Sequence, residues 1–128
     1  MAFLLIPVLL FSQEPGDSKK EIIKKIKKKS KKDSLVDYDS VLYCYSALCE
    51  GEYEVYRLNK EGACDTIEQH GPLDGVGFYK TTYKMTMHKL NDRKWVMDKG
   101  RERKIVELFT TDDQFIFIIT KKRLGFLR

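Results

Sequence analysis

The sequence predicts an all-β domain preceded by a short basic segment. Past Ser40, segments rich in Tyr, Val, Ile, Phe and Thr are separated by Gly, Asn, Asp and Pro at short intervals, which is typical of an all-β chain. One of these segments, GFYKTTYKMTM over 77–87, alternates apolar or aromatic residues with Lys and Thr, as a half-buried antiparallel strand does. The length of 128 residues, with 42% apolar residues, suits one domain with a modest core.

The β pattern predicts seven short strands. The segments NKEG, LND and MDKG between them supply residues that tolerate positive φ, and TTDD supplies side chains that bond their own backbone. Seven such strands must close into a barrel or pack as a sandwich, because one open sheet would expose an apolar face and two free edges. No internal repeat is apparent. The expected strands are 41–47, 52–58, 63–69, 77–87, 93–97, 103–109 and 115–121.

Two stretches carry a family resemblance. The stretch EGEYEVYRL, 50–58, resembles the opening strand of lipocalins, with Gly51-Glu52-Tyr53 where that family has Gly-x-Trp. The stretch IVELFTTDDQFIFII, 105–119, resembles the lipocalin segment that turns through Thr-Asp-Tyr; Thr111-Asp112 matches it, and Asp113 replaces the tyrosine. The overall style is closest to the divergent lipocalins of tick saliva.

This resemblance implies an antiparallel meander over 40–128 that closes into a lipocalin-like barrel. Only a few residues follow the strand 115–121, so the barrel is expected to be incomplete or C-terminally shortened. The resemblance also implies a secreted, salivary-type binding protein that sequesters a small hydrophobic or biogenic-amine ligand without catalysis. The carboxylate of Asp65 or Glu107 could pair with the charge of an amine ligand.

The barrel reading selects eight candidate lining residues. In a small barrel or sandwich the same side chains could instead be packed core, and this alternative stays open. The candidates are Tyr53, Val55, Tyr79, Tyr83, Met85, Trp95, Glu107 and Phe117.

The N-terminus predicts a targeting segment. The apolar run over 2–11 is shorter than the roughly 20 residues that a bilayer-spanning helix needs. It is closer to the apolar part of a signal peptide, here placed at 1–13, although no Lys or Arg precedes it. The expectation is a secreted, extracellular chain with no stable membrane span. A mis-started gene model or a buried N-terminal strand is the alternative.

Residues 14–39 form a lysine-rich arm or linker. Residues 18–32 carry nine basic side chains and one acidic one; since the whole chain has 24 and 19, the remainder holds 15 and 18 and is net −3. Ser18 and Glu21 have the spacing of a capping box, and Ile22, Ile23 and Ile26 fall on one helical face, which predicts a short helix.

This arm suggests a second function class. It could be a module that binds a polyanion such as a heparin-like polymer, nucleic acid or an anionic membrane. The plainer interpretation is a solvated arm whose charges only aid solubility. The candidate contacts are Lys24, Lys25, Lys27, Lys28 and Lys29.

The cysteines leave two possibilities open. The chain has three cysteines, Cys44, Cys49 and Cys64, so at least one thiol stays free in a secreted chain. The expected disulfide joins Cys44 and Cys49. The alternative is tetrahedral zinc held by these cysteines and His70. No serine lies in a nucleophile-elbow setting and no phosphate-binding glycine loop is apparent, so neither an enzyme nor a cofactor is expected.

Overall fold

The structure, a computed structural model, describes residues 15–29 and 32–124 and consists mostly of antiparallel β-sheet. The predicted signal peptide, 1–13, lies outside the described residues. Neither described helix is both long and apolar enough to cross a membrane. In chain order the elements are α2 (Lys19–Lys29), β1 (Ser34–Asp37), β2 (Val41–Tyr45), β3 (Tyr53–Leu58), β4 (Cys64–Pro72), the 3-10 helix η1 (Leu73–Gly75), α3 (Val76–Thr86), β5 (His88–Asn91), β6 (Lys94–Lys99), β7 (Glu102–Thr110) and β8 (Gln114–Arg123).

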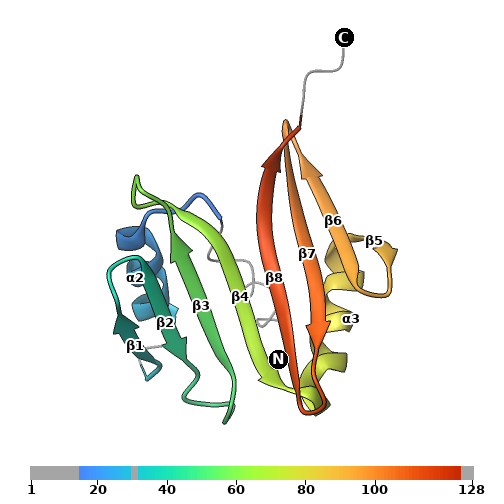
Figure 1. The fold of residues 1–128 in the computed structure, drawn as a ribbon, viewed down its shortest axis with the longest axis horizontal. Helices are drawn as coiled ribbons and strands as arrows, with labels where there is room; N and C mark the ends of the chain where they lie inside the picture. Colours follow the sequence, from blue (N-terminus) through green and yellow to red (C-terminus); the bar gives the residue numbers. More distant parts are fainter. Residues whose placement is uncertain (1–14, 30–31, 125–128) are drawn as a thin grey trace.

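The chain folds as two similar halves. Each half is a helix followed by four antiparallel strands, α2 with β1–β4 and α3 with β5–β8, and the sheet order is β1-β2-β3-β4-β8-β7-β6-β5 (Figure 1). From each edge of the sheet to its centre, the strands therefore follow their order along the chain, β1 to β4 from one edge and β5 to β8 from the other. The fold therefore contains a structural repeat, although no repeat is apparent in the sequence.

The two halves join where β4 pairs with β8. Seven residue pairs run from Thr66 and Thr120 to Pro72 and Gln114. Near the end of this pairing Gly71 lies opposite Phe115, and a Cβ atom on Gly71 would lie 2.7 Å from the Phe115 ring. Glycine therefore lets the aromatic ring cover the backbone at this point.

The predicted antiparallel meander is present within each half, as β1–β4 and as β5–β8, but its closure into a barrel is not observed. One continuous meander would pair β4 with β5, but the chain passes through η1 and α3 and enters the sheet again at its far edge. Within the described residues, the edge strands β1 and β5 pair only with β2 and β6, so the sheet stays open.

Six of the seven predicted strands are confirmed, as β2, β3, β4, β6, β7 and β8. The sequence did not predict β1 or β5, which are four residues long and lie at the edges. Their sequences, SLVD and HKLN, are too short to show alternation, and all of β5 is exposed.

The strand predicted over 77–87 is wrong, because this segment forms α3. Its larger side chains fit two periods at once. Tyr83, Met85 and Met87 alternate with Lys84 and Thr86, but Tyr79, Tyr83 and Met87 also follow one another at intervals of four residues. Spacing of four places side chains on one face of a helix. Tyr83 is fully buried, whereas Met85, on the expected apolar face of a strand, is 76% exposed.

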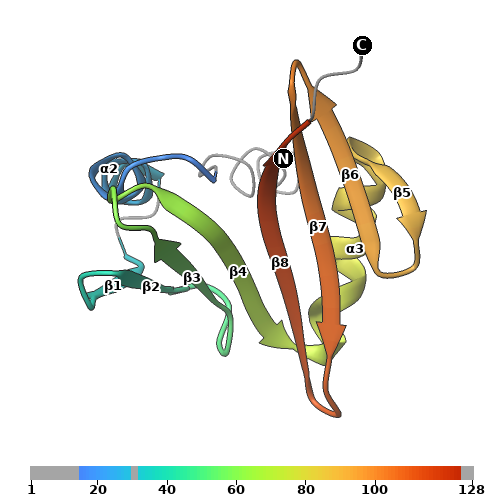
Figure 2. The same ribbon diagram turned by 45° about the horizontal axis from the view of Figure 1, so that its top comes forward.

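One core lies between the sheet and both helices. Tyr83 of α3 packs against Trp95 and Phe117, with ring centroids 6.0 and 5.1 Å apart. Ile22 and Ile26 of α2 belong to the same cluster of buried residues. We call this side of the sheet the helix-covered face and the other side the open face. Figure 2 shows α2 beside β1–β4 and α3 beside β5–β7.

The predicted helix in the lysine-rich segment is confirmed. The Ser18 backbone N–H donates to Glu21 Oε1 at 2.9 Å, and the Glu21 N–H donates to Ser18 Oγ at 3.2 Å, which is a complete capping box. Ile22 is fully buried and Ile26 is 3% exposed. Residues 19–29 are therefore part of the folded body, and their interpretation as a solvated arm is corrected.

Truncating Ile22 tests this docking. Because the side chain is fully buried, Ile22→Ala is expected to lower the free energy of unfolding by about 2–5 kcal/mol in urea denaturation. The neighbouring Ile23 is half-buried, so Ile23→Ala is the matched control and should cost clearly less. Equal effects of the two variants would contradict the packing of α2 on the sheet.

Candidate functional site

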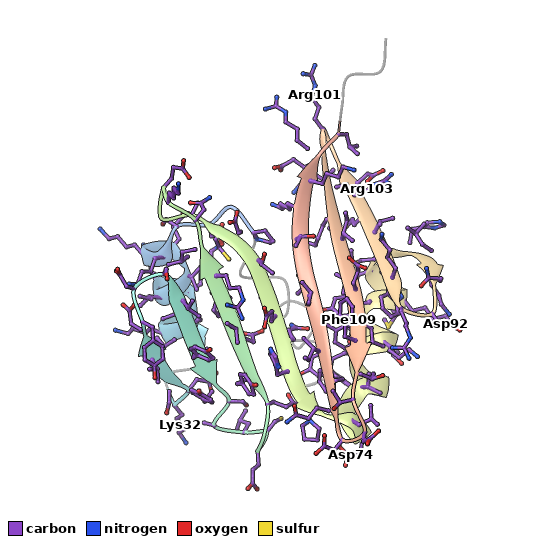
Figure 3. All side chains as sticks on the ribbon, in the orientation of Figure 1. Lys32, Asp74, Asp92, Arg101, Arg103 and Phe109 are labelled. Carbon is purple, nitrogen blue, oxygen red and sulfur yellow. The ribbon has the colours of Figure 1, made fainter. Side chains whose placement is uncertain are left out.

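The outward side of α2 is a surface of lysines. Lys20, Lys24, Lys27 and Lys28 are exposed. The last three lie four, seven and eight residues after Lys20, which places all four side chains within an arc of about 100°. We call these four residues the lysine face. It lies opposite the buried isoleucines, and Lys32 follows shortly after the helix (Figure 3).

The other described lysines of α2 hold the helix in place. Lys19 Nζ lies 2.6 Å from Asp37 Oδ1, and Lys25 Nζ lies 2.8 Å from Asp17 Oδ2. The hydrogen bond from Lys19 lowers the pKa of Asp37, so this carboxylate stays ionised to a lower pH than an unpaired one. Of the predicted contacts, Lys25 is therefore engaged within the protein. The side chain of Lys29 lies outside the described residues.

Backbone bonds fix the start of α2 against the hairpin between β3 and β4. The Gly16 N–H donates to the Cys64 carbonyl and the Cys64 N–H donates to the Asp17 carbonyl, both at 2.7 Å. The Lys19 N–H also donates to the Gly62 carbonyl at 3.3 Å. The lysine face is thus carried by a helix anchored through its cap, its backbone and its apolar side.

The lysine face concentrates positive charge. Glu21 is the one acidic residue of α2, and its carboxylate is engaged in the cap, where the bonds to Ser18 lower its pKa. Among the described residues, no carboxylate forms an ion pair with Lys20, Lys24, Lys27 or Lys28. Like charges four residues apart destabilise a helix by about 0.2–0.5 kcal/mol per pair. An anionic partner would relieve this repulsion.

The predicted ligand-lining residues do not gather around one interior. Tyr79, Tyr83, Trp95 and Phe117 do meet, but as packed rings of the core on the helix-covered face. Their contacts support the alternative that they are core residues.

The other four candidates lie elsewhere. Tyr53 is on the open face, where its ring stacks on His70 with centroids 4.5 Å apart. Val55 is 2% exposed on that face, and Glu107 lies exposed on it across β7. Met85 is exposed on α3. These eight residues lie on both sides of the sheet and so do not line one shared site, and a small-ligand site stays a prediction.

A groove that the sequence did not predict lies at the C-terminal end of α3. It has a volume of about 730 Å³ and is open to solvent. Its walls come from α3, β5 and β6 and from Arg103 of β7. Because the sequence predicts a strand over 77–87 in place of α3, it gives no indication of this groove. Its apolar lining residues are Met85, Met87, Leu90, Val96 and Met97.

A buried network of hydrogen bonds joins the two halves on the helix-covered face of the sheet. The Tyr56 hydroxyl donates to Glu54 Oε1, Gln69 Nε2 donates to Glu54 Oε2 at 3.4 Å, and the Tyr83 hydroxyl donates to Gln69 Oε1 at 2.6 Å. Burial raises the pKa of Glu54, and the bonds from Tyr56 and Gln69 oppose that rise. Because its members bond one another, the network connects β3, β4 and α3 as structure.

The predicted disulfide between Cys44 and Cys49 is not formed, and all three cysteines are free thiols. Cys44 points into the core from β2, whereas Cys49 is exposed in the loop that follows. The zinc alternative also fails, because His70 lies on the open face and Cys44 and Cys64 belong to the core. No group of potential ligands among the described residues could hold a metal ion.

These environments predict unequal thiol reactivity. Burial raises the pKa of Cys44 to about 12 and that of Cys64 to about 11, and both thiols are closed to the solvent. Partial burial also raises the pKa of Cys49, but this thiol is exposed to the reagent. Since the thiolate is the reactive form, iodoacetamide should alkylate the native chain at Cys49 alone, and all three cysteines after denaturation without reductant. Mass spectrometry of the peptides reads the result. Protection of Cys44 and Cys49 that only a reductant removes would contradict the structure.

Comparison of the chain with protein-family models, with curated proteins and with solved structures found no match.

Proposed function

We propose that this protein binds polyanions through the lysine face of α2. The observation that carries the proposal is the division of one helix into two sides. Ile22 and Ile26 are buried in the core, and four lysines point away from it without an acidic partner among the described residues. A partner would meet these charges on a docked helix, so the helix itself need not be ordered on binding.

The chemistry of the face indicates what it selects. Lysine is a compact point charge on a flexible stem and lacks the planar fork with which arginine binds phosphate in two-point geometry. Binding through several lysines releases counterions from the polyanion and weakens as salt rises. The lysine face is therefore expected to respond to charge density rather than to sequence or stereochemistry.

The rest of the chain favours one orientation. Outside 18–32 the protein is net −3, so a polyanion is attracted to α2 and gains no general attraction from the remainder. This separation of charge should orient the partner toward the helix.

A lipocalin-like barrel that sequesters a small ligand is the other function predicted from the sequence. It requires lining residues around a shared interior. The described residues place Tyr53 and Val55 on the open face and Trp95 and Phe117 in the core of the other face. The geometry supports the lysine face better.

The salt dependence of binding tests the proposal. With fluorescent single-stranded DNA as a probe of defined charge, the triple variant Lys24→Gln/Lys27→Gln/Lys28→Gln should reduce the slope of log K against log salt by about 2, because each lost contact removes about 0.7. Fluorescence anisotropy over a range of salt concentrations gives the slope.

The matched control removes three exposed lysines away from α2, as Lys89→Gln/Lys99→Gln/Lys122→Gln. It has the same net charge as the first variant and should keep nearly the wild-type slope. If both triple variants lose the same amount, binding follows net charge alone and the proposed role of α2 is contradicted.

A further inference from the structure

We propose that the polyanion is an anionic lipid surface, met by the lysine face of α2 together with exposed apolar side chains of α3 and β5. This inference rests on the proposed function and specifies its partner. Phe78 is 42% exposed, Met85 is 76% exposed and Leu90 is 50% exposed. Phe78 and Met85 are seven residues apart on α3, so they lie on the same side of the helix, two turns apart.

Basic residues accompany these apolar side chains. Lys84 is exposed and Lys80 is half-buried on α3, and no ion pair to either is formed within the described residues. A helix with lysines beside exposed Phe and Met side chains has the composition of elements that lie in the interface of an anionic membrane. The charge attracts the protein to the lipid surface, and the apolar groups enter it.

The two helices are placed to act on one surface. Ile22 and Ile26 of α2 and Tyr83 of α3 pack into a single core on the helix-covered face. Figure 1 accordingly shows both helices behind the sheet. The outward sides of α2 and α3 therefore lie on the same broad side of the molecule. A lipid surface could contact both helices there.

The exposed apolar side chains decide between lipid and other polyanions. A heparin-like polymer would be held by the lysines alone and would leave Phe78, Met85 and Leu90 in water, and a nucleic acid base could stack on Phe78 but would leave Met85 and Leu90 in water. A bilayer gives them a medium in which burial of apolar area is favourable. Met85 and Leu90 also border the groove described above, so the apolar surface continues into its walls, to Met87 and Met97.

The open face offers a matched comparison. Tyr45 is 43% exposed and Phe109 is 48% exposed, close to the value of Phe78. Both residues lie on the open face, where neither α2 nor α3 packs, and Phe109 is labelled on β7 in Figure 3. They resemble Phe78 and Met85 in apolar character but would face away from the bound membrane.

Vesicle binding tests the inference. The full chain is titrated with vesicles of phosphatidylcholine containing about 30% phosphatidylserine, and with heparin as a polyanion without bases. Phe78→Ser/Met85→Ser should weaken vesicle binding at least about ten-fold and leave heparin binding unchanged, because only the lipid surface buries these side chains. Tyr45→Ser/Phe109→Ser should leave both unchanged.

The outcomes separate the two proposals. If Phe78→Ser/Met85→Ser binds vesicles as the wild type does, the lipid inference is overturned while the polyanion function stands. If the triple lysine variant retains wild-type binding to both DNA and vesicles, the proposed function itself fails. Binding of DNA with none to the vesicles would assign the lysine face to nucleic acid.

A second measurement does not depend on weakened binding. On a Cys49→Ser background, an environment-sensitive fluorophore is attached at Met85→Cys or, as control, at Phe109→Cys. Vesicles should shift the emission of the first label to shorter wavelength and leave the second unchanged. Equal shifts at both positions, or none at Met85→Cys, would contradict the proposed orientation.

Discussion

The burial of Ile22 and Ile26 against the sheet is the contact on which the functional account depends. These side chains convert a lysine-rich stretch into part of the folded body, since Ile22 is fully buried and Ile26 is 3% exposed. Once the isoleucines fix one side of α2, the helical period directs the lysine face to the solvent. Packing thus determines where the charge is presented, and the ion pairs of Lys19 and Lys25 complete the anchorage.

The pairing of β4 with β8 extends this arrangement to the whole molecule. It joins two helix-and-four-strand halves, and both helices cover the same face of the sheet. The buried hydrogen bonds that link Glu54, Gln69 and Tyr83 connect the two halves on the helix-covered face. As a result α2 and α3 share one side of the protein, which allows charge on one helix and apolar side chains on the other to act on one surface.

Local patterns in the sequence predict much of this fold, and long-range pairing explains what they miss. The capping box at Ser18 predicts α2 because its partners lie three residues apart, and six strands follow from residue type and turns. The period of α3 is ambiguous, because Tyr79, Tyr83 and Met87 fit both alternation and a helical face. The burial of Ile22, the β4–β8 pairing and the groove depend on residues far apart in the chain, which no local pattern encodes. The lysines were predicted as contacts, but only the ion pairs show that Lys25 is engaged internally.

The most direct test of the central claim is native-state hydrogen exchange in α2. If the helix is docked through its isoleucines, backbone amides from Ile23 to Lys28 should be protected to a free energy approaching that of β4 and β8, because they open only when the core does. Exchange at the rate of an unfolded peptide, with β4 and β8 still protected, would show α2 to be undocked. The lysine face would then have no fixed place on the protein, and the account of its function would be contradicted.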